Sequence, residues 1–286
     1  MPVRIVQSKQ NARLKQLRRA LAQPSSGSSS LAGRDSKVLA GLEGPNLLSE
    51  ALRAGLRVDC VFVAQGAEHL LEALTLPPET EILLMPWDLL ESALATETPQ
   101  PIAALIEPPD WTWAHLLGGP KNSAPLVLVL AGLQDPGNLG TILRSAEAFG
   151  ADGVLVLHGT VSAWNPKAVR ASAGSVFRLP LLAVSAQESF ARLLEAGVKI
   201  WTTTVRGAQP ADLVDLAGPV ALLIGNEGNG VSDHLAAMAS GRLTIPCPGP
   251  VESLNAAVAA GVLLYEASRQ RSALSGGPLD HRKGLR

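Results

Sequence analysis

Three short blocks of this sequence place polar side chains where they could do chemistry. The first block holds Asn138 and Arg144, the second holds Glu227, and the third holds Ser253 and Asn255. Each block lies at or just after the end of an apolar run typical of a strand, so the three could converge on one crevice. Amide, hydroxyl and carboxylate groups can orient a polar substrate, and an arginine can hold a phosphate.

In the first block, a turn at Pro136 leads from a predicted strand into a predicted helix. Either Asp135 or Asn138 could cap this helix. Arg144 follows within one or two turns and can project back toward the helix start, where backbone amides favour a phosphate. A capped turn with a surface arginine is the alternative interpretation.

The second block is a glycine-rich loop at residues 225–230, directly after the apolar run 220–224. Its spacing differs from the G-x-G-x-x-G of a dinucleotide site, and the chain has no G-x-x-x-x-G-K phosphate loop. An NAD-linked or ATP-binding site is therefore disfavoured. Glu227 is the only carboxylate in the loop, and it is either a functional acid or a solvated turn residue.

In the third block, prolines at 246, 248 and 250 exclude a helix before about residue 252, where a last helix is predicted to begin. Ser253 and Asn255 fall in its first turn, where such side chains usually act as caps. The alanines and the glycine that follow place small side chains on every face of this helix. This composition predicts a helix buried inside the fold.

These blocks need a scaffold that brings distant strand ends together. From residue 126 onward, strands without interior charge alternate with helices, which predicts a mostly parallel sheet covered on both faces. The predicted strands are 126–131, 153–157, 198–204, 220–224 and 243–246. The predicted helices are 138–149, a segment after Pro166, 186–196, 232–239 and the last helix from about 252.

Compositional breaks divide the chain into segments. Residues 38–107 predict a small α/β domain, with strands at 38–42, 58–63, 81–85 and 101–106 and helices at 45–54, 68–73 and 87–95. We expect a basic arm with a serine-rich hinge at 1–37, a linker at 108–125, the domain that carries the three blocks at 126–272, and a basic tail at 273–286.

The net charge of −1 hides an uneven distribution. Residues 1–37 carry eight basic and one acidic residues, residues 38–268 eleven and twenty-three, and residues 269–286 five and one. Basic ends on an acidic body predict local contacts with nucleic acid. The candidates for phosphate contact are Arg13, Lys15, Arg18 and Arg19, and the alternative is the solvated face of a short helix.

With 286 residues and 47% hydrophobic content, the chain can bury a full core. Its longest apolar stretch, 126–133, is far shorter than the roughly 20 residues of a membrane span, and the N-terminus lacks the apolar core of a signal peptide. We therefore expect a cytoplasmic protein without membrane contacts. Cys60 and Cys247 lack metal-ligand spacing, which predicts two reduced, packed thiols and no metal site.

In this order, the blocks resemble the motifs of the SpoU/TrmH branch of the SPOUT RNA 2′-O-methyltransferases. Residues 138–144 are similar to the first motif of that family, 222–228 to its second and 245–266 to its third. Residues 165–174 match its usual intermediate segment, and 42–45 resemble the opening of its ribosomal-protein-like substrate-binding domain.

The resemblance implies an α/β fold with a C-terminal trefoil-knotted methyltransferase domain and a small N-terminal ribosomal-protein-like domain. It implies S-adenosylmethionine as cofactor, RNA as substrate and a homodimer. Backbones at Gly225, Ile245 and Leu254 match cofactor positions, and Thr203 is a further cofactor candidate. The polar catalytic set carried over from the family is Asn138, Arg144, Glu227, Ser253 and Asn255.

The chain departs from the family pattern at a few positions. Asn46 replaces the arginine common after Glu-Gly-Pro, and Cys247, Pro248 and Pro250 replace more usual residues before the third motif. These changes bear on the substrate more than on catalysis. A separate substrate-binding domain favours large-subunit ribosomal RNA over transfer RNA.

The expected reaction is methyl transfer to a ribose 2′-oxygen. Holding the two reactants in line supplies most of the rate, and the proton of the 2′-hydroxyl must also leave. An arginine is a poor base unless its pKa falls greatly, so we favour Arg144 as the group that orients the substrate phosphate and 2′-hydroxyl, with deprotonation by Arg144 as the alternative. A catalytically silent RNA-binding or ribosome-assembly factor is the competing function.

Overall fold

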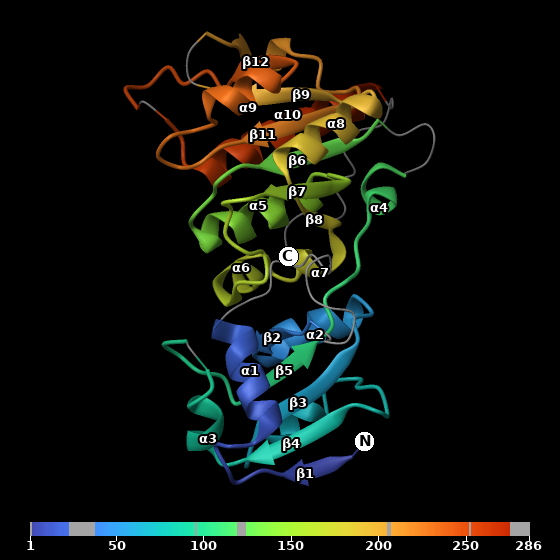
Figure 1. The fold of residues 1–286 in the computed structure, drawn as a ribbon, viewed down its shortest axis with the longest axis vertical. Coiled ribbons are helices and arrows are strands. Elements are labelled where there is room, and N and C mark those ends of the chain that lie inside the picture. The colour runs from blue at the N-terminus through green and yellow to red at the C-terminus, as the bar shows by residue number, and fades with distance from the viewer. Residues whose placement is uncertain are drawn as a thin grey trace. The chain divides into compact units, whose positions relative to one another are not determined.

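The computed structural model describes residues 2–22, 38–94, 96–118, 124–204, 207–251 and 253–274. The chain forms two compact units, each with its own sheet (Figure 1). The first unit comprises Met1–Asp110 with Ser162–Arg178, and the second comprises Trp111–Val161 with Leu179–Arg286. Both units combine strands and helices, which confirms the predicted α/β class.

The first unit is built on a mixed sheet with strand order β1-β4-β3-β5-β2. β1 and β3 run parallel to β4, whereas β5 is antiparallel to β3 and β2. The strands are β1 (Val3–Ile5), β2 (Ala40–Glu43), β3 (Val58–Ala64), β4 (Glu81–Met85) and β5 (Ile102–Ile106). The helices are α1 (Ala12–Ala22), α2 (Pro45–Arg53), α3 (Trp87–Glu91), α6 (Pro166–Ala171) and α7 (Ser175–Arg178), with a 3₁₀ turn at Glu68–Leu71.

Helix α1 belongs to this unit and not to a separate arm. Leu14, Leu17 and Leu21 are buried at the spacing of one helix face, and α1 packs against β2. Gly41 permits this contact, because a Cβ there would come within 2.8 Å of the Leu21 side chain. The predicted arm is therefore wrong for residues 2–22, and the predicted hinge lies outside the described residues.

The segment Ser162–Arg178 also packs within the first unit, although the sequence suggested a continuous domain over residues 126–272. Ala168 and Val169 of α6 are buried, and α6 contacts β2. Trp164 stacks on Phe177 with ring centroids 6.2 Å apart. The sequence did not reveal that this segment belongs to the first unit, because strands of the second unit precede and follow it along the chain.

The second unit is built on a fully parallel sheet with strand order β10-β12-β9-β11-β6-β7-β8. The strands are β6 (Leu126–Leu130), β7 (Gly153–Leu157), β8 (Leu181–Val184), β9 (Lys199–Thr203), β10 (Gln209–Pro210), β11 (Val220–Ile224) and β12 (Gly241–Thr244). The helices are α4 (Trp113–Leu117), α5 (Pro136–Ala148), α8 (Ala186–Glu195), α9 (Asp233–Met238) and α10 (Ala256–Leu274), with a 3₁₀ turn at Ala211–Leu213.

The predicted linker at 108–125 is partly folded. Its residues from Trp111 onward belong to the second unit, and α4 contacts β7. Leu116 is 1% exposed within the core beneath β6, β7 and β11. A helix this short is not visible as a periodic pattern. Residues 119–123 of the predicted linker lie outside the described residues.

Helix α10 packs on α5 through one face only. Ala260, Leu263 and Leu264 are buried, whereas Val258 and Tyr265 are 52% and 48% exposed. The prediction of a helix buried on every side is therefore wrong within this single chain. Neither α10 nor any other helix of the described ranges has the length and apolar character needed to cross a membrane.

Two neighbouring side chains anchor the C-terminal end of α10. The Arg271 guanidinium donates hydrogen bonds to the backbone carbonyls of Ala124 and Gly218, among others, and the Gln270 amide donates to the carbonyl of Val214. Burial lowers the pKa of Arg271, and these carbonyls supply partners for the buried charge. The anchor fixes the helix whose first turn borders the candidate site.

Candidate active site

The turn between β6 and α5 shows which residue caps the helix. Oδ1 of Asp135 accepts a hydrogen bond from the backbone N–H of Gly137 at 2.6 Å, and Pro136 occupies the first helical position. Asp135 is therefore the cap, not Asn138. This arrangement releases the side chain of Asn138 for contacts outside the helix.

The carboxylate of Glu227 lies against this turn. Its Oε1 accepts hydrogen bonds from Nδ2 of Asn138 at 3.1 Å and from the backbone N–H of Asp135 at 3.4 Å. Its Oε2 accepts one from the backbone N–H of Gln134 at 3.3 Å. The first two sequence blocks therefore meet, as predicted, although 89 positions separate Asn138 from Glu227.

Asn255 extends this arrangement to the third block. Its Nδ2 donates to Oδ1 of Asn138 at 3.1 Å, and its Oδ1 accepts from the backbone N–H groups of Ala257 and Val258 at 2.9 and 3.3 Å. A carboxylate only accepts, so Asn138 must turn its NH₂ toward Glu227 and its oxygen toward Asn255. Asn255 thus caps α10 and also fixes the Asn138 amide. We call Glu227, Asn138 and Asn255 the polar chain.

The pKa of Glu227 lies below the ordinary glutamate value. Partial burial of the carboxylate opposes ionisation, but hydrogen bonds from Asn138 and from the backbone N–H groups of Gln134 and Asp135 favour the charged form and outweigh it. Glu227 is therefore a charged acceptor at neutral pH. It is suited to holding Asn138 and poorly suited to taking up a proton.

Arg144 stands apart from the polar chain. It is exposed on α5, with no hydrogen bond or ion pair to any residue in the described ranges. Because it follows Asn138 by six positions, it points about 120° away around the helix axis. The structure therefore does not place Arg144 against the Asn138 side chain, and its guanidinium remains available to a ligand.

Ser253 and Leu254 lie in the irregular segment before α10. The helix begins at Ala256 and not near residue 252, so the predicted place of Ser253 in its first turn is wrong. Its exposed side chain instead borders the cleft described next. Glu252 lies outside the described residues.

A cleft of about 690 Å³ opens at the carboxyl ends of β9, β11 and β12. The four predicted cofactor residues, Gly225, Ile245, Leu254 and Thr203, all line it, together with Glu227 and Ser253. Its volume is that of an ordinary small-molecule site, and its position at strand ends is the usual one in parallel sheets.

Two features show how the cleft suits a polar cofactor. Thr202 is one of the lining residues, and its hydroxyl is buried without a hydrogen-bond partner among the described residues, so a ligand that reached it could satisfy it. Thr203, which the sequence singled out, instead donates its hydroxyl to the Leu223 carbonyl at 3.1 Å. Gly225 leaves no space for a side chain, because a Cβ would come within 2.3 Å of backbone atoms of Gly230 and Val231.

Sequence reasoning missed several cleft residues. Thr202, Asp233 and Arg242 line the cleft but lie outside the motifs, and Cys247, which the sequence marked only as a departure from the family pattern, lines it as well. Cys247 is exposed, so the prediction of a packed thiol is wrong there. For Cys60 it is confirmed, and burial raises the pKa of that thiol to about 12.

A shallow hollow of about 510 Å³ lies between α5 and α10. Asn138 and Asn255 line it, as do apolar side chains further along the two helices, including Phe149 and Tyr265. These two rings pack edge to face with centroids 5.9 Å apart. The polar chain therefore borders an uncovered apolar surface as well as the cleft at the strand ends.

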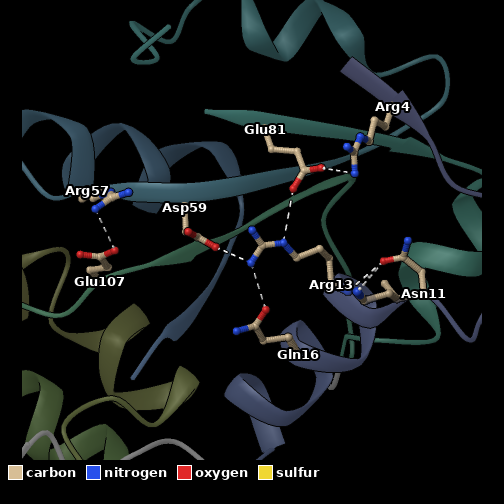
Figure 2. A network of polar contacts seen from close by, with 9 residues as sticks. Arg4, Asn11, Arg13, Gln16, Arg57, Asp59, Glu81 and Glu107 are labelled. Carbon is tan, nitrogen blue, oxygen red and sulfur yellow. Dashed lines mark hydrogen bonds and ion pairs between the residues drawn. The ribbon is translucent and has the colours of Figure 1, made fainter. Parts of the chain in front are cut away.

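The predicted phosphate-binding residues belong to the first unit, and they differ among themselves. Figure 2 shows Arg13 held between Asp59, at 2.6 Å, and Glu81, at 3.3 Å. Its guanidinium is therefore a structural link between α1 and the sheet. Lys15, Arg18 and Arg19 are exposed on α1, where Arg18 donates to the Ser92 hydroxyl at 3.4 Å.

No group of three or more histidine, cysteine, aspartate or glutamate side chains that could hold a metal ion gathers among the described residues. The side chains at the polar chain and around the cleft are amides, hydroxyls, the carboxylates of Glu227 and Asp233 and the guanidinium of Arg242, and Arg144 is exposed on α5.

Comparison with known proteins agrees with this geometry. The model of the SpoU rRNA methylase family matches residues 125–265. The 23S rRNA (guanosine(2553)-2′-O)-methyltransferase RlmP of Bacillus subtilis is 34% identical over 228 residues, which cover 78% of this chain and 86% of RlmP. An uncharacterized tRNA/rRNA methyltransferase of Mycolicibacterium vanbaalenii is 35% identical over 80% of this chain and 76% of its own length.

Solved structures are also similar. The SpoU methyltransferase AviRb from Streptomyces viridochromogenes, in complex with S-adenosylmethionine, superimposes with a TM-score of 0.76 at 30% identity and covers 92% of this chain and 98% of its own. An rRNA methyltransferase from Sinorhizobium meliloti bound to the same cofactor gives 0.75 at 29% identity, with 93% of this chain and 98% of its own covered.

The parallel sheet and the cleft at its strand ends define an α/β protein with a site for a small molecule. The chain belongs to the SpoU family of RNA 2′-O-ribose methyltransferases, which use S-adenosylmethionine.

Proposed function

We propose that this protein methylates a ribose 2′-oxygen of large-subunit ribosomal RNA, with the polar chain as the core of its catalytic site. The observation that carries the proposal is the convergence of Glu227, Asn138 and Asn255, from three distant blocks, beside the cofactor cleft. A catalytically silent RNA-binding factor, which is the competing function, would not need these three side chains to converge.

The residues of the cleft would hold S-adenosylmethionine, which supplies a methyl group activated by a sulfonium. Backbone groups around Gly225, Ile245 and Leu254 are open to its polar edges, and the unpartnered Thr202 hydroxyl can join them. Leu254 and neighbouring apolar side chains offer a surface for a flat ring. Ser253 lies at the same border as Glu227, where cofactor and RNA would meet.

The polar chain would position the nucleotide. Glu227 is charged and fixes the Asn138 amide, and the three side chains together present a rigid set of donors and acceptors. Arg144 would bind the substrate phosphate and orient the 2′-hydroxyl, because no other described residue neutralises its charge. Deprotonation by Arg144 itself stays the alternative mechanism.

Large-subunit ribosomal RNA is the proposed substrate, with transfer RNA as the alternative. Support comes from the separate first unit, which suits a ribosomal-protein-like substrate-binding domain, and from the 23S rRNA specificity of RlmP. Lys15, Arg18 and Arg19 would contact phosphates. We also retain the cytoplasmic location and the trefoil knot as proposals, the knot supported by family membership and by the parallel sheet order.

A homodimer is the proposed assembly. The hollow between α5 and α10 and the exposed Val258, Val262 and Tyr265 form an apolar surface that a second copy would cover. Light scattering should give about twice the 29.7 kDa chain mass. Mixing an Arg144→Ala chain with a cofactor-blocked Leu254→Trp chain should restore activity if each site uses residues from both copies.

The proposed function is tested by mapping 2′-O-methylated nucleotides in ribosomal and transfer RNA from cells with and without the protein. Loss of one large-subunit site is the expected result. Loss of a transfer RNA site would assign the alternative substrate, and an unchanged map alongside tight S-adenosylmethionine binding would favour the silent factor.

A further inference from the structure

Asn226, the residue before Glu227, ties together the two loops that build the polar chain. Its Nδ2 donates to the backbone carbonyl of Gly132 at 2.7 Å, across 94 positions of sequence. Gly132 has a positive φ of 75°, a backbone conformation that glycine adopts readily. A Cβ on Gly132 would stand 3.8 Å from the Asn226 Cβ. One loop holds Gln134 and Asp135, and the other holds Glu227.

The same residue also closes the loop that carries Glu227. Oδ1 of Asn226 accepts from the backbone N–H groups of Gly228 and Asn229 at 2.8 and 3.2 Å. Its backbone N–H and carbonyl exchange hydrogen bonds with Gly230, both at 2.9 Å. Glu227 is therefore carried on a tight turn whose shape and attachment both depend on Asn226.

We propose that Asn226 is a positioning residue for methyl transfer, acting through the amide donor that ties the Glu227 turn to the Gly132 loop. Without this tie, the carboxylate would separate from the backbone N–H groups of Gln134 and Asp135 and from the Asn138 amide. Asn138 would then lose the partner that fixes its orientation. The proposal rests on the proposed function, since it concerns the same site.

The two roles of the side chain can be separated by substitution. Asn226→Asp keeps an oxygen that can accept from Gly228 and Asn229 but has no donor for Gly132, whereas Asn226→Ala loses both. Gln187→Glu is the matched control. It makes the same amide-to-carboxylate change at an exposed position of α8 in the same unit, outside the lining of the cleft.

The measurements are kcat and KM for RNA, the Kd for S-adenosylhomocysteine by calorimetry, the pH–rate profile and the melting temperature. We expect kcat to fall about ten- to a hundredfold in both Asn226 variants, the range expected for a misplaced catalytic group, while the Kd changes by less than about threefold. The acidic limb of the profile should move to higher pH in Asn226→Ala, because Glu227 loses the donors that lower its pKa.

Wild-type kcat in Asn226→Asp together with an unmoved acidic limb in Asn226→Ala would overturn the proposal, and so would an Asn226→Asp chain that is unfolded, since the residue would then be merely structural. A loss of kcat in Gln187→Glu equal to that in Asn226→Asp would also overturn it. An inactive wild-type enzyme that still binds S-adenosylhomocysteine would instead count against the proposed function.

Discussion

Each unit contains a polar network with a carboxylate at its centre, but the two networks differ in how the charges are balanced. In the first unit, Arg13 is held between Asp59 and Glu81, and Glu81 also pairs with Arg4 (Figure 2). In the second unit, Glu227 is held by amides and backbone N–H groups alone, and no ion pair to it exists among the described residues. The first network satisfies its own charges, whereas in the second unit the carboxylate of Glu227 and the guanidinium of Arg144 each have no ion-pair partner among the described residues.

This difference separates an arginine that is paired within the fold from the one that we propose binds the substrate. Arg13 and Arg144 were both predicted to meet RNA, but Arg13 is neutralised within the fold and Arg144 is not. A ligand can gain little from a cation that is already paired with two carboxylates. The comparison therefore predicts opposite consequences when the two residues are changed.

The largest effect is expected from Arg144→Ala. Methylation should fall at least about a hundredfold, because the variant removes the charge that orients the substrate, while cofactor binding survives since Arg144 does not line the cleft. Steady-state kinetics and calorimetry check both parts. Arg192→Ala, which removes an exposed arginine from α8, is the control and should retain activity. Near-normal turnover in Arg144→Ala would contradict the assignment.

A somewhat smaller loss is expected from Glu227→Gln. The glutamine side chain has nearly the same shape but carries no charge, so the Asn138 amide loses its charge-assisted partner. We expect kcat to fall about tenfold or more with little change in the Kd of the cofactor. Single-turnover kinetics at saturating cofactor measures this directly. A variant as fast as wild type would show that the carboxylate charge is dispensable.

The basic face of α1 should contribute to affinity and not to chemistry. Replacing Lys15, Arg18 and Arg19 with glutamine should lower the log–log salt slope of RNA binding by about 2–3 at most. The methylated nucleotide should stay the same. Binding titrations over a range of salt concentration check this result, and an unchanged slope would restore the interpretation of these residues as a solvated helix face.

Arg13→Gln should act on stability instead. Losing its bonds to Asp59 and Glu81 should cost about 1 kcal/mol of unfolding free energy, the scale of a partly exposed ion pair. Because Arg13 is neutralised in the fold, the salt slope of RNA binding should not change. Denaturant titration measures the stability, and the same binding assay measures the salt slope. A lower salt slope with unchanged stability would contradict the structural role of Arg13.

The smallest effect concerns pH. The pKa of Glu227 is depressed in the folded state, so its contribution to stability is present above the unfolded glutamate pKa of about 4.3 and is lost as the pH falls through the folded value. The difference in unfolding free energy between wild type and Glu227→Gln should therefore shrink in that acidic range. A difference that stays constant with pH would argue against the hydrogen bonds that hold Glu227.

The regular elements were largely predictable from the sequence. Strands at 81–85, 153–157 and 220–224 have the predicted bounds, because each is a short, mostly apolar run with the length of a buried strand. Strand β1 was missed, since Val3 and Ile5 are exposed and its only partner, β4, is distant in sequence. The grouping of 162–178 with the first unit depends on tertiary packing, which no local pattern reports.

The sequence predicted which residues gather at the candidate site but not the hydrogen bonds that join them. The motifs pointed to Asn138, Glu227 and Asn255, yet the order of hydrogen bonds among them depends on distances between segments far apart in sequence. The choice of Asp135 as helix cap and the position of Ser253 before α10 were likewise set by local geometry. Arg13 was misassigned because its carboxylate partners, Asp59 and Glu81, lie in other elements.

The most direct test follows a labelled methyl group from S-adenosylmethionine into large-subunit ribosomal RNA, using the intact RNA and a matched RNA with 2′-deoxyribose at the mapped nucleotide. The wild-type protein should label the intact RNA and leave the 2′-deoxy RNA unlabelled, and Arg144→Ala should label neither to more than about a hundredth of that level. Equal labelling of both RNAs, or full labelling by Arg144→Ala, would contradict 2′-O-methylation at this site.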